Sequence, residues 1–170
     1  MIATKLPFIF LSTIILEMND KAKAPNFLGN IEENEQISLE DFRGKYLVIY
    51  FYPKDKTSGC TVESQNFRDL FKDFQKLNCD IIGVSRDSLK SHKSFIEKES
   101  LNFPLISDPE EEMCNAYGVM KEKSMYGRKY MGIERSTFLI GPDGKLIKEW
   151  RNVKVPGHAQ EVFEHLQSVI

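Results

Sequence analysis

The chain has 170 residues, a length that fits one domain. Apolar residues make up 41% and charged residues 28%, which excludes a disordered tail, a collagen-like chain and a coiled coil. The formal net charge is −2, whereas a dedicated nucleic-acid binder usually carries a basic excess, so we expect no nucleic-acid partner.

The first 18 residues are predicted to form an N-terminal extension, with one domain over 19–170. The run 6–16 is apolar but shorter than the about 20 residues that a transmembrane helix needs, so no stable membrane association is expected. Lys5 precedes the run, as in a signal peptide, but no small-residue cleavage site follows it. Retention, cleavage and an alternative start remain open. A cytoplasmic location is expected, with export as the minor alternative.

Alternating apolar runs and helical periodicities predict the elements of the domain. A hairpin is expected within 19–45, then a helical turn over 39–42 entered through Ser38. The run 46–52 is continuously apolar, which is typical of a strand buried on both faces of a covered sheet. The other elements are predicted as helices over 60–77, 89–99, 110–117 and 159–170, and strands over 80–85, 103–107, 135–140 and 146–150.

Two segments need a separate interpretation. Pro104 cannot donate a ladder hydrogen bond, so the strand 103–107 is expected at a sheet edge. Residues 119–134 are predicted to be a long polar loop, and its basic and aromatic part, 121–130, is interpreted as a loop covering the active site. The order of elements predicts an α/β fold with a central mixed β-sheet flanked by helices.

The chain has three cysteines: Cys60, Cys79 and Cys114. An odd, sparse set does not make a disulfide framework, and neither a CxxC pair nor a Cys/His cluster suggests zinc. We therefore expect no bound metal and a reducing compartment.

The chemistry concentrates at Cys60. It lies in the first turn of a predicted helix that follows a buried strand, where the unpaired amides and the positive helix end favour thiolate over thiol. Thr57 lies close enough to offer its hydroxyl to the sulfur or to a bound oxygen, and Pro53 stiffens the entry to the loop. The alternative is a small, inert cysteine at a helix start, since free cysteine is often buried.

The other candidates are weaker. Cys79 lies at the negative end of the same helix and Cys114 follows three glutamates, so both are interpreted as structural, with Cys114 also a candidate redox partner. Arg135 opens a strand, where it is either a solvated charge or a fixed cation beside the thiolate.

The three histidines give no catalytic signal. His92 and His165 lie on predicted helices and are expected to be solvated or half-buried, and His158 is expected to start the last helix. None has motif spacing to Cys60, so no Cys–His hydrolase dyad is predicted.

The pattern from Pro53 through Thr57 to Cys60, with Arg135 at the head of RSTFLI, resembles a peroxiredoxin. The segments FYPKDKTSGCTVE, YGVMKEKSMYGRKYMGIERSTFLI and EWRNVKVPGHAQEV resemble the bacterioferritin comigratory protein (PrxQ) group. This resemblance covers about residues 21–170. It implies a thioredoxin-like fold and a thiol-dependent peroxidase that reduces hydrogen peroxide and organic hydroperoxides, protecting the cell against oxidative stress without a metal, haem or flavin cofactor.

The resemblance also implies residue roles. Cys60 would be the peroxidatic cysteine that becomes sulfenic acid. Thr57 and Arg135, with the backbone amides of Gly59 and Cys60, would hold the peroxide oxygens and stabilise the leaving oxygen. Pro53 would shield the sulfur from water. A further residue, Glu63, would orient polar groups near the site.

Two positions depart from the group's pattern. Ser58 stands where the group commonly has proline, and Gln65 stands where many members carry a resolving cysteine. An external thiol (thioredoxin, glutaredoxin or a small thiol) is therefore expected to reduce Cys60. Resolution by Cys79 or Cys114 after local unfolding is the alternative.

The resemblance to this group favours a monomer. Two competing functions are a peroxide-sensing redox switch or holdase that uses Cys60 oxidation without fast turnover, and a thiol–disulfide oxidoreductase. The absent CxxC weighs against the oxidoreductase.

Overall fold

The computed structural model describes residues 22–170, so the expectations for residues 1–18 lie outside the described part. The strands are β1 (Leu28–Glu32), β2 (Glu35–Ser38), β3 (Tyr46–Phe51), β4 (Cys79–Ser85), β5 (Leu105–Ser107), β6 (Met120–Met125), β7 (Arg128–Ile133), β8 (Ser136–Ile140) and β9 (Leu146–Trp150). The helices are the 3-10 turn η1 (Leu39–Phe42) and α2 (Ser58–Lys76), α3 (Leu89–Glu99), α4 (Glu112–Ala116) and α5 (His158–Val169).

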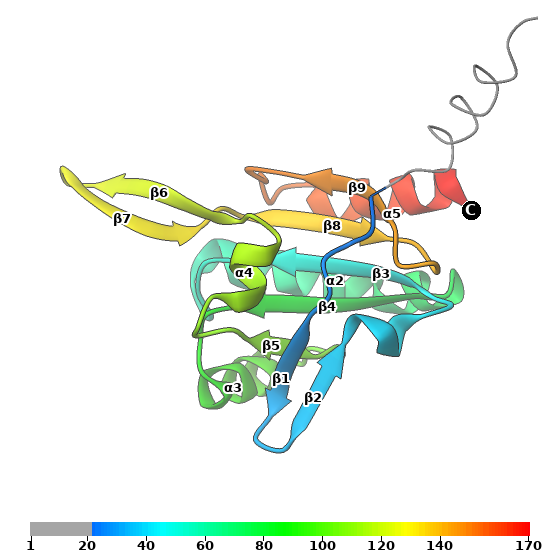
Figure 1. Cartoon of the computed structure of the whole chain (residues 1–170), viewed down its shortest axis with the longest axis horizontal. Helices are drawn as coiled ribbons and strands as arrows, with labels where there is room; N and C mark the ends of the chain where they lie inside the picture. The colour runs from blue at the N-terminus through cyan, green and yellow to red at the C-terminus, as the bar shows by residue number, and fades with distance from the viewer. Residues whose placement is uncertain (1–21) are drawn as a thin grey trace, which may run out of the picture.

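A mixed seven-stranded sheet forms the centre, with strand order β2-β1-β5-β4-β3-β8-β9 (Figure 1). Strands β3, β4 and β5 are parallel, and β8 joins β3 in the antiparallel sense. Parallel strands have their carboxyl ends at one edge of a sheet, where ligands of open α/β folds bind. The loops after β3, β4 and β5 therefore meet at a single edge.

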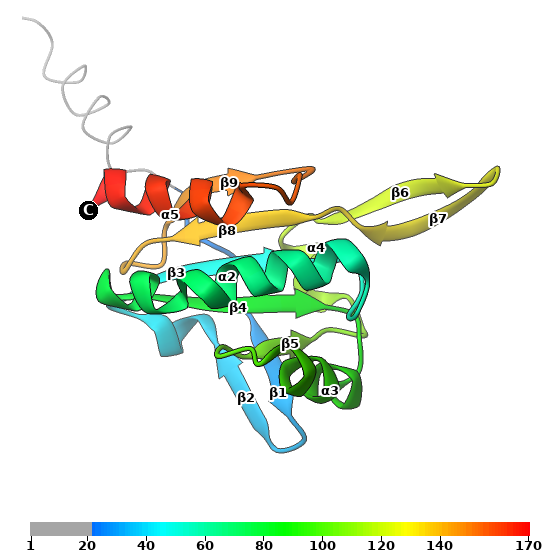
Figure 2. The ribbon, with the colours of Figure 1, turned by 180° about the vertical axis from the view of Figure 1, so that it is seen from behind.

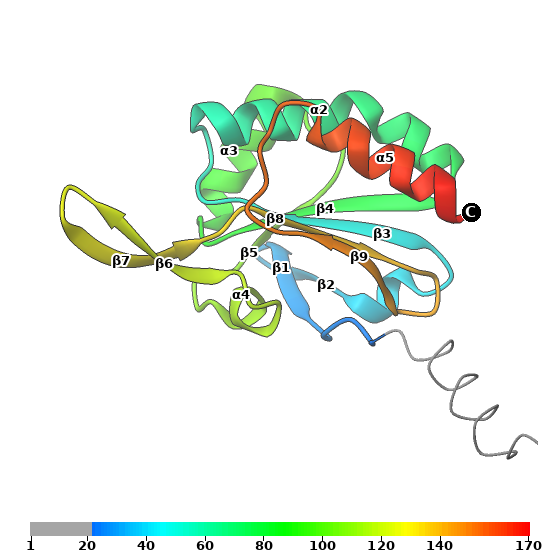
Figure 3. The same ribbon diagram turned by 90° about the horizontal axis from the view of Figure 1, so that it is seen from above.

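The predicted burial of both sheet faces is confirmed. Successive side chains of a strand point to opposite faces, so Val48 and Tyr50 of β3 enter one core while Leu47 and Ile49 enter the other. Helices α2, α3 and α5 cover the first face and α4 the second (Figure 3). Seen from behind, α2 and α5 run side by side (Figure 2). Between them the rings of Phe74 and Phe163 meet edge to face, with their centroids 5.2 Å apart.

The expectation of an edge strand at 103–107 is wrong. The strand begins at Leu105 and lies between β1 and β4, inside the sheet. Pro104 precedes the strand, where no ladder donor is required of it, and its carbonyl accepts the Gly83 N–H at 3.2 Å. The proline therefore does not restrict the strand to an edge.

The expectation of a polar loop over 119–134 is also wrong. Strands β6 and β7 pair in register from Met120↔Ile133 to Met125↔Arg128 and form a hairpin that projects from the body (Figure 1). Tyr126 and Gly127, both with positive φ, form its two-residue turn. The strands carry exposed side chains on both faces for most of their length, so no apolar alternation marks them in the sequence.

The helices follow the sequence closely. Helix α3 has the predicted bounds, and the hydroxyl of Ser88 caps it by accepting the Ser91 N–H at 3.1 Å. Helix α2 begins at Ser58, two positions before the predicted start, and α4 is shorter than predicted. Within residues 22–170, no helix combines the length and apolar character that a membrane crossing requires.

Candidate active site

The turn between β3 and α2 presents Cys60. Thr57 is the helix N-cap in an extended conformation, and its carbonyl accepts the Thr61 N–H at 2.9 Å. The N–H groups of Gly59 and Cys60 come before that bond, so the helix offers them no carbonyl partner. Cys60 is 1% exposed, whereas Thr57 is exposed at the surface. The thiol is thus buried directly beneath a polar, accessible turn.

Arg135 comes from a distant part of the sequence and reaches the same turn. It immediately precedes β8, whose first residue, Ser136, pairs with Phe51 at the end of β3. Its carbonyl accepts the Val153 N–H at 3.0 Å, which fixes the backbone. Its Nη2 lies 3.4 Å from the Cys60 Sγ. The structure therefore gives Arg135 the position of a fixed cation at the thiol.

Glu63 holds the other end of the guanidinium. It lies one helical turn after Cys60, and its Oε1 accepts a hydrogen bond from Arg135 Nη1 at 2.8 Å. Gly59 leaves room for this arrangement, because a Cβ there would lie 3.3 Å from Arg135 Nη2. Cys60, Glu63 and Arg135 are thereby brought together, although Arg135 lies far from the other two in sequence.

Burial has the largest effect on the pKa values of Glu63 and Arg135. Desolvation raises the pKa of Glu63 to about 7, although the charge and hydrogen bond of Arg135 oppose the rise. Its Oε2 has no hydrogen-bond partner within the described residues. Burial alone would lower the pKa of Arg135, but Glu63 and Cys60 outweigh it and raise that pKa. Arg135 is thus a permanent charge, while Glu63 titrates near neutrality.

Thr57 differs in detail from the expectation. Its hydroxyl donates to the carbonyl of Lys54 at 2.7 Å, so the hydrogen is directed into the loop. The oxygen of Thr57 keeps its lone pairs as acceptors for an incoming O–H group. Pro53 is half-buried at the start of the same loop, and Lys56 has a φ of 65°. The turn is therefore shaped by internal hydrogen bonding before any substrate arrives.

Polar groups below the turn escaped the sequence reasoning. Tyr50 Oη and Ser64 Oγ share a buried hydrogen bond of 2.8 Å, and Tyr52 Oη donates to Asp55 at 2.6 Å. His92 is 1% exposed and contacts Asp55, so the expectation of a solvated or half-buried histidine is wrong. The available signal was the pair of tyrosines inside an apolar strand, because buried tyrosine hydroxyls usually have a partner.

The other two cysteines lie away from the turn. Cys79 opens β4 at the amino edge of the sheet and pairs in register with Tyr46. Cys114 lies on α4, in the core of the opposite face. Burial, followed by the charge of Asp80, raises the pKa of Cys79. Burial and Asp108 raise the pKa of Cys114. Both thiols are therefore held in the neutral form.

Comparison with known proteins gives the family. A sequence profile of the AhpC/TSA family matches residues 21–149. The chain belongs to the AhpC/TSA family. The peroxiredoxin Bcp of Xanthomonas campestris pv. campestris is 51% identical over 133 residues, covering 78% of this chain and 83% of the relative. The peroxiredoxin Bcp of Bacillus subtilis is 48% identical over 147 residues, covering 86% and 94%.

A solved structure supports the same assignment. The bacterioferritin comigratory protein of Xanthomonas campestris, studied for its alkyl peroxide reduction activity, superposes with a TM-score of 0.80 at 47% identity. The match covers 84% of this chain and 90% of that one. This peroxiredoxin is thus a thiol peroxidase of the Bcp/PrxQ group with a thioredoxin-like fold, as its sequence motifs predicted.

Proposed function

We propose that Cys60 is the peroxidatic cysteine and that the peroxidase works with this single redox-active thiol. The observation that carries the proposal is the Arg135 guanidinium, shared between the Cys60 sulfur at 3.4 Å and Glu63 at 2.8 Å. A fixed cation and the unpaired amides of a helix start lie at the same sulfur, the surroundings in which reactive cysteines are found.

The proposed first step is a two-electron oxidation of the sulfur. The Cys60 thiolate attacks the distal oxygen of a hydroperoxide, an S–O bond forms, and the O–O bond breaks. The leaving oxygen departs as hydroxide or alkoxide and takes up a proton, so the products are sulfenic acid and water or an alcohol. Arg135 and the amides of Gly59 and Cys60 stabilise the charge that develops on that oxygen.

The substrate is held by groups of complementary type. Thr57 accepts the hydroperoxide O–H, since its own hydrogen is directed to Lys54. Glu63 orients Arg135 and Pro53 limits access of water to the sulfur. The Xanthomonas campestris relative reduces alkyl peroxides, and we extend alkyl hydroperoxides, together with hydrogen peroxide, to this chain.

An external thiol completes the cycle in this proposal. Cys79 lies beside the first residue of β3, whereas the Cys60 sulfur contacts Arg135, the neighbour of the residue that pairs with the last residue of β3. A six-residue strand is about 16 Å from end to end. Disulfide formation needs Cα atoms within about 7 Å. Cys114 lies in the core of the other sheet face. Thioredoxin, glutaredoxin or a small thiol would therefore reduce the sulfenic acid. The proposal further takes the protein to act as a monomer in the cytoplasm.

The test is a titration of the reduced protein with one equivalent of hydrogen peroxide. Intact mass and free-thiol counts are read with and without a trap for sulfenic acid, and Cys60→Ser is the control. We expect oxidation at Cys60 with both other thiols free, and turnover once a thiol reductant is added. A peptide linking Cys60 to Cys79 or Cys114 would overturn the one-cysteine mechanism. Oxidation without turnover would favour a redox switch instead.

A further inference from the structure

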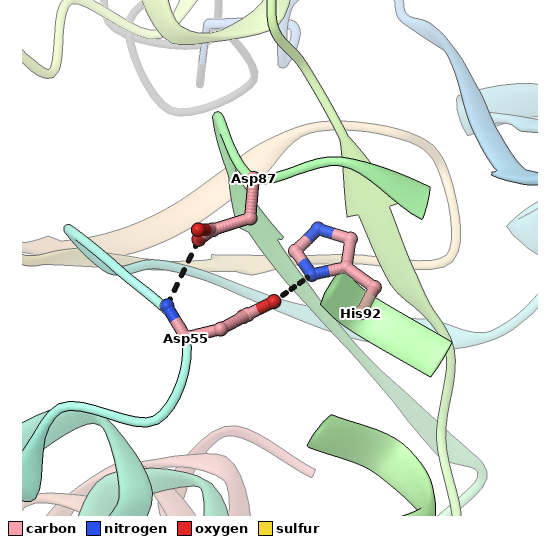
Figure 4. Close-up of side chains that lie close together, drawn as sticks. All are labelled: Asp55, Asp87 and His92. Carbon is pink, nitrogen blue, oxygen red and sulfur yellow. Dashed lines mark hydrogen bonds and ion pairs between the residues drawn. The ribbon is translucent and has the colours of Figure 1, made fainter. Parts of the chain in front are cut away.

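Asp55, Asp87 and His92 form a polar cluster at the carboxyl edge of the parallel strands (Figure 4). Asp55 lies in the loop between β3 and α2, Asp87 follows β4, and His92 lies on α3. His92 and the Asp55 side chain are each 1% exposed. The cluster therefore joins the loop that carries Thr57 to the two elements packed against it.

Each ring nitrogen of His92 faces an oxygen atom of the cluster or its surroundings. Its Nδ1 lies 2.7 Å from Asp55 Oδ2 and its Nε2 lies 3.0 Å from the carbonyl oxygen of Ile106. Both partners are acceptors, and a neutral imidazole has only one N–H. While Asp55 is ionised, both contacts are hydrogen bonds only when both ring nitrogens carry a proton. His92 and Asp55 are therefore placed as a buried ion pair.

The carboxylate of Asp55 accepts two further hydrogen bonds. Tyr52 donates to Oδ1 at 2.6 Å and Ser91 to Oδ2 at 2.9 Å. Burial would raise the pKa of Asp55, but the hydrogen bond and charge of His92 outweigh it and lower that pKa. The negative charge of Asp55 is therefore stable despite its burial.

The cluster is not arranged for a metal ion. Asp55 Oδ2 faces the N–H of His92 and the hydroxyl of Ser91. Asp87 Oδ2 accepts the Asp55 N–H at 2.9 Å and the Ser85 hydroxyl at 2.5 Å. A cation would have to displace these donors, since it binds the same lone pairs. The hydrogen bonds point to a structural role for the cluster.

The loop that the ion pair holds also carries Thr57. Asp55 is fixed at its side chain by His92 and at its backbone by Asp87. The preceding residue, Lys54, supplies the carbonyl that receives the Thr57 hydroxyl at 2.7 Å. The position of Asp55 therefore sets the orientation of that carbonyl. The carbonyl in turn decides where the lone pairs of Thr57 point.

We propose that the His92–Asp55 ion pair is a positioning device that orients the Thr57 hydroxyl for peroxide. His92 and Asp55 touch neither substrate nor sulfur in this role. They act through Lys54 and Thr57, and the inference rests on the proposed function of Cys60.

The first experiment uses the wild-type protein. Its histidines are labelled with ¹⁵N, and the ring signals of His92 are assigned by their loss in His92→Asn. At pH 7.5 we expect both ring nitrogens of His92 to be protonated. A neutral tautomer, with one protonated nitrogen, would overturn the ion pair.

The second experiment is a double-mutant cycle of Asp55→Asn and Thr57→Val. Two single-turnover rates are measured: oxidation of Cys60 by hydrogen peroxide, and its alkylation by iodoacetamide, which does not use Thr57. Each single variant is expected to lose on the order of 100-fold in the peroxide rate, the scale of a 1 Å misplacement. The alkylation rate should not fall.

The double variant decides the proposal. If Asp55 acts through Thr57, Asp55→Asn will cost little in the Thr57→Val background. Losses that multiply would overturn the inference, as would an Asp55→Asn protein with the wild-type peroxide rate. Lys93→Ala, an exposed neighbour of His92, is the matched control and should behave as wild type.

The two proposals fail in different ways. A wild-type Cys60 that does not react with peroxide removes the proposed function. A reactive wild type whose Asp55→Asn variant is equally fast removes only the positioning role. If His92→Asn does not fold, the ring signals of His92 are assigned by comparing the wild-type spectrum with those of His158→Asn and His165→Asn. The double-mutant cycle of Asp55 and Thr57 does not use the His92→Asn variant.

Discussion

At the scale of single residues, the side chain of Arg135 serves two partners. Its Nη1 binds the Glu63 carboxylate and its Nη2 contacts the Cys60 sulfur. Arginine can do this because its planar guanidinium holds several donors in a fixed fork, which lysine lacks. The geometry of the site therefore depends on the residue type and not on the positive charge alone.

Replacing Arg135 by lysine tests this dependence. The Arg135→Lys variant keeps the charge but cannot contact both partners, so its peroxide rate should fall on the order of 100-fold, as for loss of one oxyanion donor. Single-turnover oxidation of Cys60 gives the rate. Arg128→Lys, at an exposed position in β7, is the control. An unchanged rate in Arg135→Lys would show that charge suffices.

Glu63 makes the stability of the protein depend on pH. Its pKa of about 7 in the fold lies above the ordinary 4.5, so folding takes up a proton between these values. The contribution of Glu63 is therefore most favourable below pH 4.5 and is lost as pH rises to about 7, by roughly 3 kcal/mol. The protonated carboxyl is the better-tolerated form in this buried place.

The Glu63→Gln variant should lack this dependence. Urea unfolding at pH 5 and pH 8 gives the free energy of unfolding of both proteins. We expect the variant to gain in stability relative to wild type as the pH rises, since glutamine has no charge to bury. Parallel pH curves for the two proteins would contradict the assignment.

At the scale of elements, the β6–β7 hairpin stands apart from the main sheet. Among residues 22–170 its strands pair only with each other, and Tyr126 at its turn is 98% exposed. An isolated two-stranded hairpin is only marginally stable in water. Its root is better anchored, because Ile133 is buried in the core of the second sheet face.

Amide hydrogen exchange should be faster in the β6–β7 hairpin than in the main sheet. We expect the amides of 121–130 to exchange by local opening, long before those of β3, which exchange only on global unfolding. Peptide-resolved mass spectrometry measures both in one experiment. Equal protection of the two segments would mean that the hairpin is covered in solution.

At the scale of the whole molecule, the three cysteines lie at different places in the fold. Cys60 lies at the carboxyl edge, Cys79 at the amino edge, and Cys114 on the opposite face. A disulfide to Cys60 would therefore require local unfolding. This separation follows from the topology and could not be obtained from sequence spacing.

The double variant Cys79→Ala/Cys114→Ala tests the consequence. Turnover of hydrogen peroxide with a saturating thiol reductant should equal that of wild type, because neither thiol enters the proposed cycle. Steady-state peroxide consumption is the measurement, with Cys60→Ser as the inactive reference. Loss of turnover in a double variant that still folds would assign a resolving role to one of the two.

The local sequence was sufficient for most elements and for the helix start that carries Cys60. The continuous apolar run of β3 predicted a sheet covered on both faces, and Ser88 marked the start of α3. The turn from Pro53 to Cys60 carries its chemistry in neighbouring residues. Such features depend on interactions between residues close in sequence, which composition and spacing record.

Tertiary structure alone decided the rest. The neighbours of β5 and the pairing of β6 with β7 depend on long-range contacts, so Pro104 and the polar residues 119–134 were misinterpreted. The burial of His92 against Asp55 likewise arises where α3 packs on the loop after β3. The sequence by itself predicted Cys60 as the candidate nucleophile at a helix start, because that pattern is local. Only the folded chain decided which distant charges face that loop, because packing brings them there.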